Sequence, residues 1–188
     1  PKYISNNPNK RYNLEGFLFP DTYSFNKNEN ADFIIKTMLN RFEKVWQEIV
    51  EDLNISIPEE EIEKKVNVAS MIEKEAVVDS ERSFISSVIY NRIAIGMPLQ
   101  IDATVIYSYG YHIEKMYEKY LEIDSPYNTY MYYGLPIGPI SNPGRASLMA
   151  ALKPEKTDYL YYLLESEYTH YFTDNYDDFL RRKEELGY

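Results

Sequence analysis

The stretch from residue 66 to residue 76 constrains this chain most, because its apolar residues recur with the period of a helix and it carries two glutamates. One side of that helix is apolar and is formed by Val68, Met71 and Ile72. At about 100° per residue, Glu75 lies about 20° from Val68, whereas Glu73 lies about 140° away, beside Ser70. The pattern therefore predicts that Glu75 points toward the body of the domain and that Glu73 points toward water.

The predicted surroundings of Glu75 suggest two uses for its carboxyl group. Among apolar neighbours a carboxyl group has a raised pKa, which makes it a proton donor near neutral pH. Alternatively, Glu75 pairs with a basic residue or caps a neighbouring loop, since structural ion pairs also perturb pKa values. Helix geometry alone leaves both interpretations open.

Composition narrows the class of protein. A chain of 188 residues with 44% hydrophobic residues suits one domain, or one domain with a small appendage. The net charge of −10 argues against nucleic acid as the main partner and provides no polybasic patch for a lipid surface. The 20 tyrosines suit a groove that holds polar, ring-shaped ligands such as sugars, although a general drift toward Tyr, Asn, Ile and Lys explains them equally well.

Several residue types and segments are missing. The chain has no cysteine and only two histidines, His112 and His170, so it offers no thiol nucleophile and no His-rich metal site. We therefore expect neither a metal nor a cofactor. No apolar run approaches the roughly 18 residues of a membrane span, and no signal peptide is visible. The chain begins at Pro1 rather than Met, so we expect a fragment from which an export signal or anchor has been removed.

The periodicities predict an α+β fold, with helices packed around a small, mostly antiparallel sheet in one compact domain from residue 14 to residue 188. Residues 1–13 are polar and are predicted to be a tail or the end of a linker. The predicted helices span residues 31–53, 66–76, 81–95 and 143–153. The predicted strands span residues 17–25 and 99–107 and a C-terminal hairpin of residues 159–165 and 170–172.

Polar residues alternate with apolar ones in the predicted strand 99–107. In an extended segment this alternation places Gln100, Asp102 and Thr104 on one side, which suits a saccharide or a peptide. An ordinary half-buried strand with one wet face remains an alternative.

Two further segments carry candidate site residues. Glu15 is a lone acid among apolar neighbours, and it is either a group of the substrate site or a capping carboxylate. Residues 134–144 hold three prolines and three glycines, and a long ordered loop of this kind is often functional. The loop ends at Asn142, the predicted N-cap of helix 143–153. No G-x-S-x-G or glycine-rich phosphate loop is present, although Ser/His/Asp chemistry stays open.

Five motifs in this order resemble one known family from about residue 14 to residue 180. They are Leu14–Tyr23 (LEGFLFPDTY), Ala69–Glu75 (ASMIEKE), Tyr90–Arg92 followed by Gly96–Val105 (GMPLQIDATV), Tyr127–Tyr130 (YNTY) and Gly134–Gly144 (GLPIGPISNPG). The family is that of the YceG-like, or MltG, endolytic murein transglycosylases.

The resemblance implies a bacterial enzyme that acts at the extracytoplasmic face of the cell membrane. Such enzymes cleave the β-1,4 bond between N-acetylmuramic acid and N-acetylglucosamine in nascent glycan strands, leave a 1,6-anhydro-muramyl end and limit strand length. Family members carry an N-terminal transmembrane helix and a LysM-like region, so residues 1–13 are expected to be the tail of that region. The implied partners are peptidoglycan strands and cell-wall synthases.

The resemblance also implies a site. Its catalytic glutamate maps to Glu75, the residue that the helical wheel selects independently, with Glu73 as the second candidate. We expect Glu73 and Glu15 as outer supports of the site. The expected substrate-binding residues are Gln100, Asp102, Thr104, Asn128, Thr129, Tyr130 and Asn142. Two other functions stay open, namely a catalytically silent peptidoglycan-binding scaffold for synthases and a hydrolase that uses water.

Overall fold

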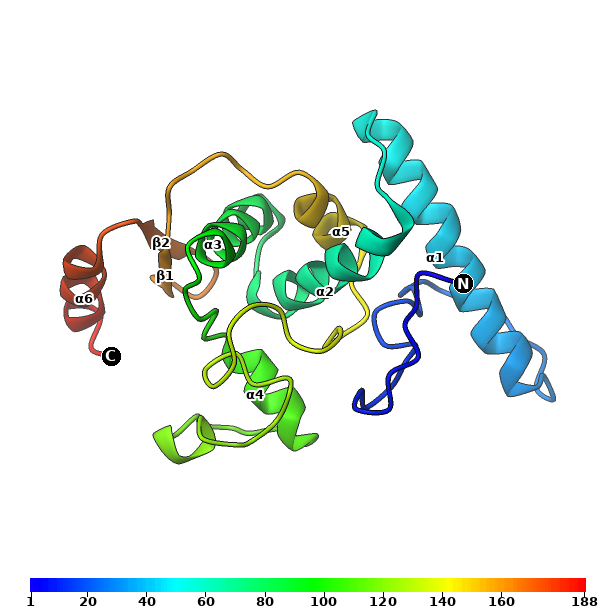
Figure 1. Ribbon diagram of the computed structural model, residues 1–188, viewed down its shortest axis with the longest axis horizontal. Coiled ribbons are helices and arrows are strands. Elements are labelled where there is room, and N and C mark those ends of the chain that lie inside the picture. Colours follow the sequence, from blue (N-terminus) through cyan, green and yellow to red (C-terminus); the bar gives the residue numbers. More distant parts are fainter.

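The computed structural model describes residues 1–188 and contains six α-helices and one antiparallel hairpin (Figure 1). The helices are α1 (Ala31–Leu53), α2 (Glu59–Glu75), α3 (Arg82–Ala94), α4 (Asp102–Tyr109), α5 (Arg145–Leu152) and α6 (Tyr176–Glu185). The strands are β1 (Tyr161–Leu164) and β2 (His170–Thr173), and short 3-10 turns lie at η1 (Asp79–Glu81) and η2 (Glu118–Tyr120). The predicted α+β class is confirmed, and so is the C-terminal hairpin.

Helix α2 lies at the centre of the molecule, packed against α5, α3 and α4 (Figure 1). Every residue from Val66 to Ile72 is buried, so this part of α2 has no solvent-facing side. The expectation of a polar side through Ser70 is therefore wrong. The loop 134–144 covers that side, because the Ser70 hydroxyl donates to the Asn67 carbonyl at 2.7 Å and accepts from the Ile140 amide at 3.0 Å.

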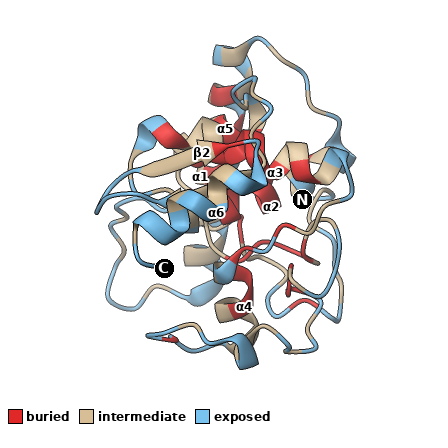
Figure 2. Ribbon diagram, turned by 90° about the vertical axis from the view of Figure 1, so that its left-hand side faces the viewer, coloured by how far each residue is buried: buried red, intermediate tan, exposed pale blue.

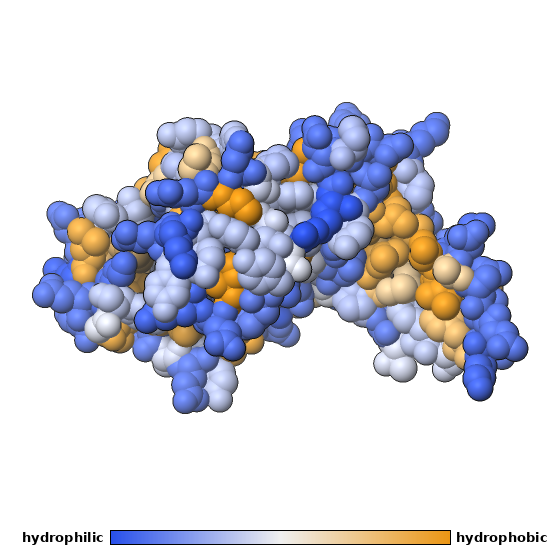
Figure 3. Space-filling view, turned by 90° about the horizontal axis from the view of Figure 1, so that it is seen from below, coloured by the Kyte–Doolittle hydropathy of each residue, from blue (hydrophilic) through white to orange (hydrophobic).

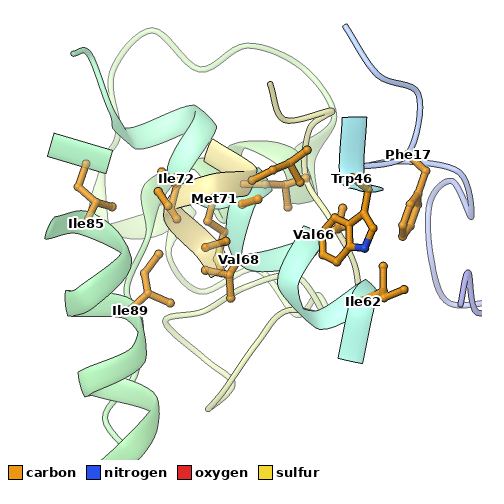
Figure 4. Packing of buried hydrophobic residues seen from close by; sticks show 14 of the residues in the cluster. Phe17, Trp46, Ile62, Val66, Val68, Met71, Ile72, Ile85 and Ile89 are labelled. Carbon is orange, nitrogen blue, oxygen red and sulfur yellow. The ribbon is translucent and has the colours of Figure 1, made fainter. Parts of the chain in front are cut away.

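The hydrophobic core is built around α2, and buried residues gather on α2, α3 and α5 (Figure 2). Figure 4 shows Val68, Met71 and Ile72 of α2 between Ile85 and Ile89 of α3 on one side and Trp46 on the other. Truncating a fully buried residue such as Ile72 to Ala would cost about 2–5 kcal/mol. This packing fixes where the C-terminal end of α2, and with it Glu75, lies.

Helix α1 agrees with the prediction at both ends. Its N-cap is Asn30, whose side chain accepts a hydrogen bond from the Phe33 amide at 2.8 Å, and it ends at Asn54 in the left-handed conformation. The buried residues recur at the helical period and are Phe42, Val45, Trp46 and Ile49. In Figure 1 α1 lies at the opposite end of the molecule from the hairpin and α6.

Two predicted strands are wrong. Residues 17–25 form no strand, because Gly16 turns the chain at a φ of +92° and a Cβ there would lie 2.6 Å from Pro139. Residues 102–109 form helix α4, which follows Gln100 at a φ of +51°. The alternation of residues 99–107 therefore does not place Thr104 on one face with Gln100, and Thr104 is buried.

The other helices differ from the prediction mainly at their ends. Helix α2 begins at Glu59 rather than residue 66, and the acidic residues of its first turn suit the positive end of the helix dipole. Helix α5 has Gly144 as its N-cap, so the prediction for Asn142 is wrong. The Asn142 side-chain oxygen instead accepts from the amides of Gly16 and Leu18, at 2.9 and 3.1 Å.

The first residues pack against the rest of the chain. Lys10 is buried, where its ammonium group pairs with Glu63 of α2 and donates to the Ser5 hydroxyl. The domain boundary at residue 13 stays a prediction. No helix combines the length and the apolar character that crossing a membrane requires. The face of the molecule on which α4 lies is largely polar, with an apolar patch on the side of α1 (Figure 3).

Candidate active site

Glu75 is the last residue of α2 and lines a cavity of about 480 Å³. The cavity lies between the end of α2, the start of α4 and the hairpin with α6. Its lining residues are Glu75, Arg92, Leu99, Gln100, Asp102, Tyr130, Tyr162, Leu163, Leu164, His170, Phe179, Lys183 and Tyr188. The cavity therefore combines acidic, basic and aromatic side chains from segments that lie far apart in the sequence.

The Glu75 carboxyl group is half-buried and is held by one hydrogen bond, which Tyr162 of β1 donates to Oε2 at 2.9 Å. Burial raises the pKa of Glu75 above its ordinary value of 4.5, and the nearby Asp102 carboxylate raises this pKa further. The Tyr162 hydroxyl and His170 act in the opposite direction on the same pKa. Oε1 has no partner in the protein, so Glu75 presents one carboxyl oxygen to whatever occupies the cavity.

Asp102 and Tyr130 form a second polar pair in the cavity. The Tyr130 hydroxyl donates to Asp102 Oδ1 at 2.5 Å, and burial together with this bond raises the pKa of Tyr130. The neighbouring Gln100 has an exposed side chain and a left-handed backbone, which is uncommon outside glycine. Its amide donates to the Thr129 carbonyl at 3.1 Å, which holds the strained turn in place. Gln100, Asp102 and Tyr130 thus lie in the same cavity as Glu75.

Four of the predicted substrate-binding residues do not line this cavity; Asn142 lies elsewhere, and the other three support the cavity wall. Thr104, Asn128 and Thr129 are buried, and their side chains join the start of α4 to the loop 121–130. The Thr129 hydroxyl accepts from the Ile101 amide at 3.0 Å and lies 2.9 Å from the Thr104 hydroxyl. Asn128 donates to two carbonyl groups of residues 121 and 123 at 2.8 and 2.9 Å. These residues build the wall that positions Tyr130 and Asp102.

Helix α3 positions the hairpin that carries Tyr162. The Asn91 side chain donates to the carbonyl groups of Thr157 and Tyr159 at 2.8 and 2.9 Å. The buried guanidinium of Arg92 donates to the Leu160 carbonyl at 2.6 Å and to the Leu99 carbonyl at 2.7 Å. Because one side chain bonds both the residue before β1 and the residue before Gln100, Arg92 fixes the two walls of the cavity relative to each other.

A buried pair of titratable residues lies behind Tyr162. Glu81 accepts from the His170 amide at 2.8 Å, and its second oxygen lies 2.7 Å from His170 Nδ1. The His170 ring packs edge-on against the Tyr162 ring, with 5.5 Å between the centroids. Glu81 therefore fixes the orientation of an imidazole that lines the cavity and supports the tyrosine that bonds Glu75.

Glu73 lies outside this cavity. One oxygen, Oε2, accepts from the Ser147 hydroxyl at 2.6 Å and from the Gly144 amide at 3.1 Å, and Arg82 approaches it at 3.5 Å. The expectation that Glu73 faces water is thus wrong, because α5 packs its N-terminus against that side of α2. Glu73 satisfies the Gly144 amide and the Ser147 hydroxyl at the start of α5 and complements the dipole of that helix.

Glu15 also lies outside the cavity, together with Asn142. The Asn142 side chain donates to Glu15 Oε1 at 3.1 Å and the Tyr107 hydroxyl donates to Oε2 at 3.3 Å. Burial raises the pKa of Glu15. The two residues line a separate hollow with residues 11–14 and Leu18. No three His, Asp or Glu side chains converge anywhere in the chain as ligands of a metal ion would.

Several residues of the cavity were missed in the sequence. Arg92 stands in the motif Tyr90–Arg92, yet nothing in that motif shows that its side chain reaches β1. Tyr162 and His170 follow Glu75 by 87 and 95 residues, so only the folded hairpin brings them to it. For Glu81 the sequence offers one signal, an acidic residue at the start of a predicted helix. In the structure the Glu81 side chain is buried.

A general acid–base group needs a carboxyl group of raised pKa, room for a ligand beside it, and neighbours that hold it in place. Glu75 meets these three conditions and Glu73 does not. The model of the YceG-like family matches residues 2–185, and the chain belongs to this family.

The chain is similar to characterised members of that family. It is 42% identical over 182 residues to the endolytic murein transglycosylase of Bacillus subtilis strain 168, covering 95% of this chain and 49% of that protein. It is 31% identical over 177 residues to the endolytic murein transglycosylase of Streptococcus pneumoniae R6, covering 89% of this chain and 31% of that protein. The chain thus spans half or less of these relatives.

A solved structure shares the fold. The crystal structure of a YceG-like protein from Listeria monocytogenes superposes with a TM-score of 0.82 at 40% sequence identity, covering 93% of this chain and 57% of that one.

Proposed function

We propose that this chain is the catalytic domain of an endolytic lytic transglycosylase that cleaves peptidoglycan strands. The observation that carries the proposal is the carboxyl group of Glu75, which has a raised pKa and lines a 480 Å³ cavity of polar and aromatic side chains. Membership of the YceG-like family and the names of its relatives support the same conclusion. The proposed bond is the β-1,4 bond between N-acetylmuramic acid and N-acetylglucosamine.

One carboxyl group suffices for this reaction. Ordinary glycosidases use two carboxylates, of which one is the nucleophile or activates water. In the proposed reaction protonated Glu75 gives its proton to the glycosidic oxygen as the bond to C1 breaks. The ionised Glu75 then takes the proton of the muramyl C6 hydroxyl, whose oxygen forms the new bond to C1. The attack is intramolecular, and its high effective molarity lets it outcompete water.

The neighbours of Glu75 are suited to both halves of this cycle. Burial and Asp102 favour the protonated form that begins the reaction. The hydrogen bond from Tyr162 favours the carboxylate that follows proton transfer, so the two influences keep both forms accessible. Asp102 also places a negative charge near the sugar, where it would stabilise the positive charge that develops at C1. Gln100 and Tyr130 would bind sugar hydroxyl and acetamido groups.

The cellular role follows from the proposed chemistry. An enzyme that cuts within nascent strands would limit their length, so we propose action at the extracytoplasmic face of the bacterial cell membrane, with cell-wall synthases as partners. A membrane anchor would belong to the parent protein. A metal or cofactor is not required for the proposed steps.

The runner-up is a catalytically silent scaffold that binds peptidoglycan and holds synthases together. The acidic, tyrosine-rich surface would serve either function. The raised pKa of Glu75 favours the enzyme, because burying a carboxyl group is costly and a scaffold gains nothing from it.

Mass spectrometry of the products from purified, uncrosslinked glycan strands tests the proposal. We expect anhydro-muramyl ends that lie about 18 Da below the ends that a hydrolase leaves, since no water is added. The Glu75→Gln variant, which keeps the size of the side chain and loses its proton, should release none. Products that retain water would show a hydrolase. Strands that bind and stay intact would show the scaffold.

A further inference from the structure

A second cavity, of about 540 Å³, lies between the N-terminal loop and α4. It is lined by Arg11, Tyr12, Lys74, Ala103, Ile106, Tyr107, Gly110, Tyr111, His112 and Ile140. Three of these residues carry basic side chains and none carries a carboxylate. The chain as a whole has 30 acidic residues against 20 lysines and arginines, so a cavity with basic groups alone is an exception to its composition.

Arg11 is fixed in this cavity by α4. Its Nη1 donates to the Tyr107 carbonyl at 2.7 Å, and its guanidinium group lies over the Tyr107 ring at 5.5 Å from the centroid. Gly110 makes room for it, because a Cβ at that position would lie 1.9 Å from Arg11 Nη2. The other two guanidinium nitrogens make no hydrogen bond with the protein. A guanidinium group held in this way is prepared to bind a carboxylate.

Lys74 adds a second free cation. Its side chain is exposed, and neither Lys74 nor Arg11 takes part in any ion pair of the structure. The acid that Lys74 influences is Glu15, whose carboxyl group already accepts from Asn142 and Tyr107. Glu15 therefore offsets part of the positive charge, but no carboxylate forms an ion pair with Lys74 or Arg11.

The second cavity adjoins the first. Lys74 precedes Glu75 in α2, and Ala103 follows Asp102 in α4, so each helix gives neighbouring residues to the two cavities, and Ile106 and Tyr107 of α4 also line the second. The two cavities therefore meet at the end of α2 and the start of α4. A side branch on a sugar bound at Glu75 would reach the second cavity by passing over the end of α2 and the start of α4.

We propose that the basic cavity, defined by Arg11, Lys74 and His112, binds a carboxylate of the acidic peptide that the muramyl sugar carries. The inference rests on the proposed function, because it takes peptidoglycan as the substrate. The rings of Tyr107 and Tyr111 and the side chain of Ile106 offer apolar contacts for the methyl groups of such a peptide. The enzyme would then recognise strands that still carry peptides in preference to bare glycan.

Equilibrium binding to the Glu75→Gln protein, which does not cleave, tests this site. The two ligands are uncrosslinked glycan strands with their peptides and the same strands after an amidase has removed them. Adding Lys74→Gln or Arg11→Gln should weaken binding of the peptide-bearing strands about tenfold, since a charge-assisted contact is lost, and should leave binding of the bare strands unchanged. Lys156→Gln, at an exposed lysine without an ion pair, is the matched control and should change neither.

Arg11→Lys separates folding from recognition, because it keeps the charge and loses the planar fork. We expect it to weaken peptide-dependent binding less than Arg11→Gln does, with an unchanged melting temperature. Raising the salt concentration should reduce the advantage of peptide-bearing strands. If the Lys74 and Arg11 variants lost affinity equally for peptide-bearing and bare strands, the cavity would be a glycan subsite. If they lost affinity for neither, the cavity would be a solvated surface. Each result overturns the proposal. Because binding is measured without cleavage, failure of the proposed reaction would show separately, as a wild-type protein that releases no product.

Discussion

Glu73 and Glu75 stand two residues apart in the last turn of α2, yet the fold treats them differently. Glu73 accepts hydrogen bonds from Ser147 and Gly144 and lies beside Arg82, so its negative charge is matched by the start of α5. Glu75 has one hydrogen bond, from Tyr162, and its pKa is raised by burial and by Asp102. Two identical side chains thus differ in surroundings, which gives Glu73 a structural role and suits Glu75 to the chemical role that we propose for it.

The difference teaches how an acid–base group is set apart from a structural carboxylate. A carboxylate that accepts from several donors and lies beside a cation holds neighbouring elements together, which favours folding. A carboxyl group with one donor and one unpaired oxygen gains less from folding and keeps its proton at higher pH. The contrast predicts that damage to one residue appears in stability and damage to the other in rate.

Removing Glu73 should have the largest effect on stability. Glu73→Ala leaves the Gly144 amide and the Ser147 hydroxyl without their acceptor and Arg82 without its partner, so we expect a loss of about 1–2 kcal/mol in the free energy of unfolding. In a chain of this size that lowers the melting temperature by about 3–6 °C. Lys44→Ala, at an exposed position of α1 without an ion pair, is the control. An unchanged melting temperature of Glu73→Ala would contradict the structural role assigned to Glu73.

Removing the hydroxyl group of Tyr162 should act on rate. Tyr162→Phe takes away the only donor to Glu75, so we expect kcat to fall about tenfold. The donor favours the ionised carboxylate, so its loss raises the pKa of Glu75 further, and the decline of rate on the alkaline side moves to higher pH. The neighbouring Tyr161→Phe, whose ring packs on Tyr176 and Phe179, should leave the pH profile unchanged.

Removing the charge of Asp102 should shift the dependence of rate on pH toward lower pH, opposite to the shift expected for Tyr162→Phe. The Asp102 carboxylate raises the pKa of Glu75, so Asp102→Asn should lower it, and the alkaline decline of rate should begin at lower pH. The measurement is kcat/KM against pH for the wild type, Asp102→Asn and Tyr162→Phe on one substrate. Shifts in the same direction for both variants would show that Glu75 is not the group that titrates.

The smallest expected effect is the change in the free energy of unfolding caused by Glu75→Gln. Its pKa in the folded protein lies above its ordinary value of 4.5, so the protein gains from Glu75 only while the group is protonated. That contribution is complete below the unfolded pKa and is lost as pH rises through the folded pKa. Glu75→Gln should therefore be as stable as the wild type in acid and slightly more stable at neutral pH. Urea unfolding at several pH values would show the opposite trend if Glu75 were a structural ion pair.

The sequence alone predicts several of the helices. The helical period of residues 31–53 predicts the bounds of α1 to the residue, with Asn30 or Asp32 as the N-cap, because that helix has one solvent-facing side and one buried side. The same reasoning erred on α2, where Ser70 and Glu73 lie on the polar side of the wheel and are covered by the loop 134–144 and by α5. A wheel assumes one solvent-facing side, and a central helix has none.

The site was predicted in part for a related reason. Glu75, Gln100, Asp102 and Tyr130 were expected together and do line one cavity. The predicted position of Thr104 is wrong because alternation of polar and apolar residues indicates a strand. Asp102 instead begins a helix after the left-handed turn at Gln100. Tyr162 and His170 were not found, since the residues that bring the hairpin to Glu75 act through contacts far apart in sequence.

The paired variants Glu75→Gln and Glu73→Gln test the central claim most directly, on the same peptide-bearing strands and with the release of anhydro-muramyl ends as the readout. We predict that Glu75→Gln lowers the rate by about a thousandfold and keeps its melting temperature, whereas Glu73→Gln stays within about tenfold of the wild-type rate. A fast Glu75→Gln variant, or a Glu73→Gln variant that is folded and inactive, would contradict the assignment of the two carboxyl groups.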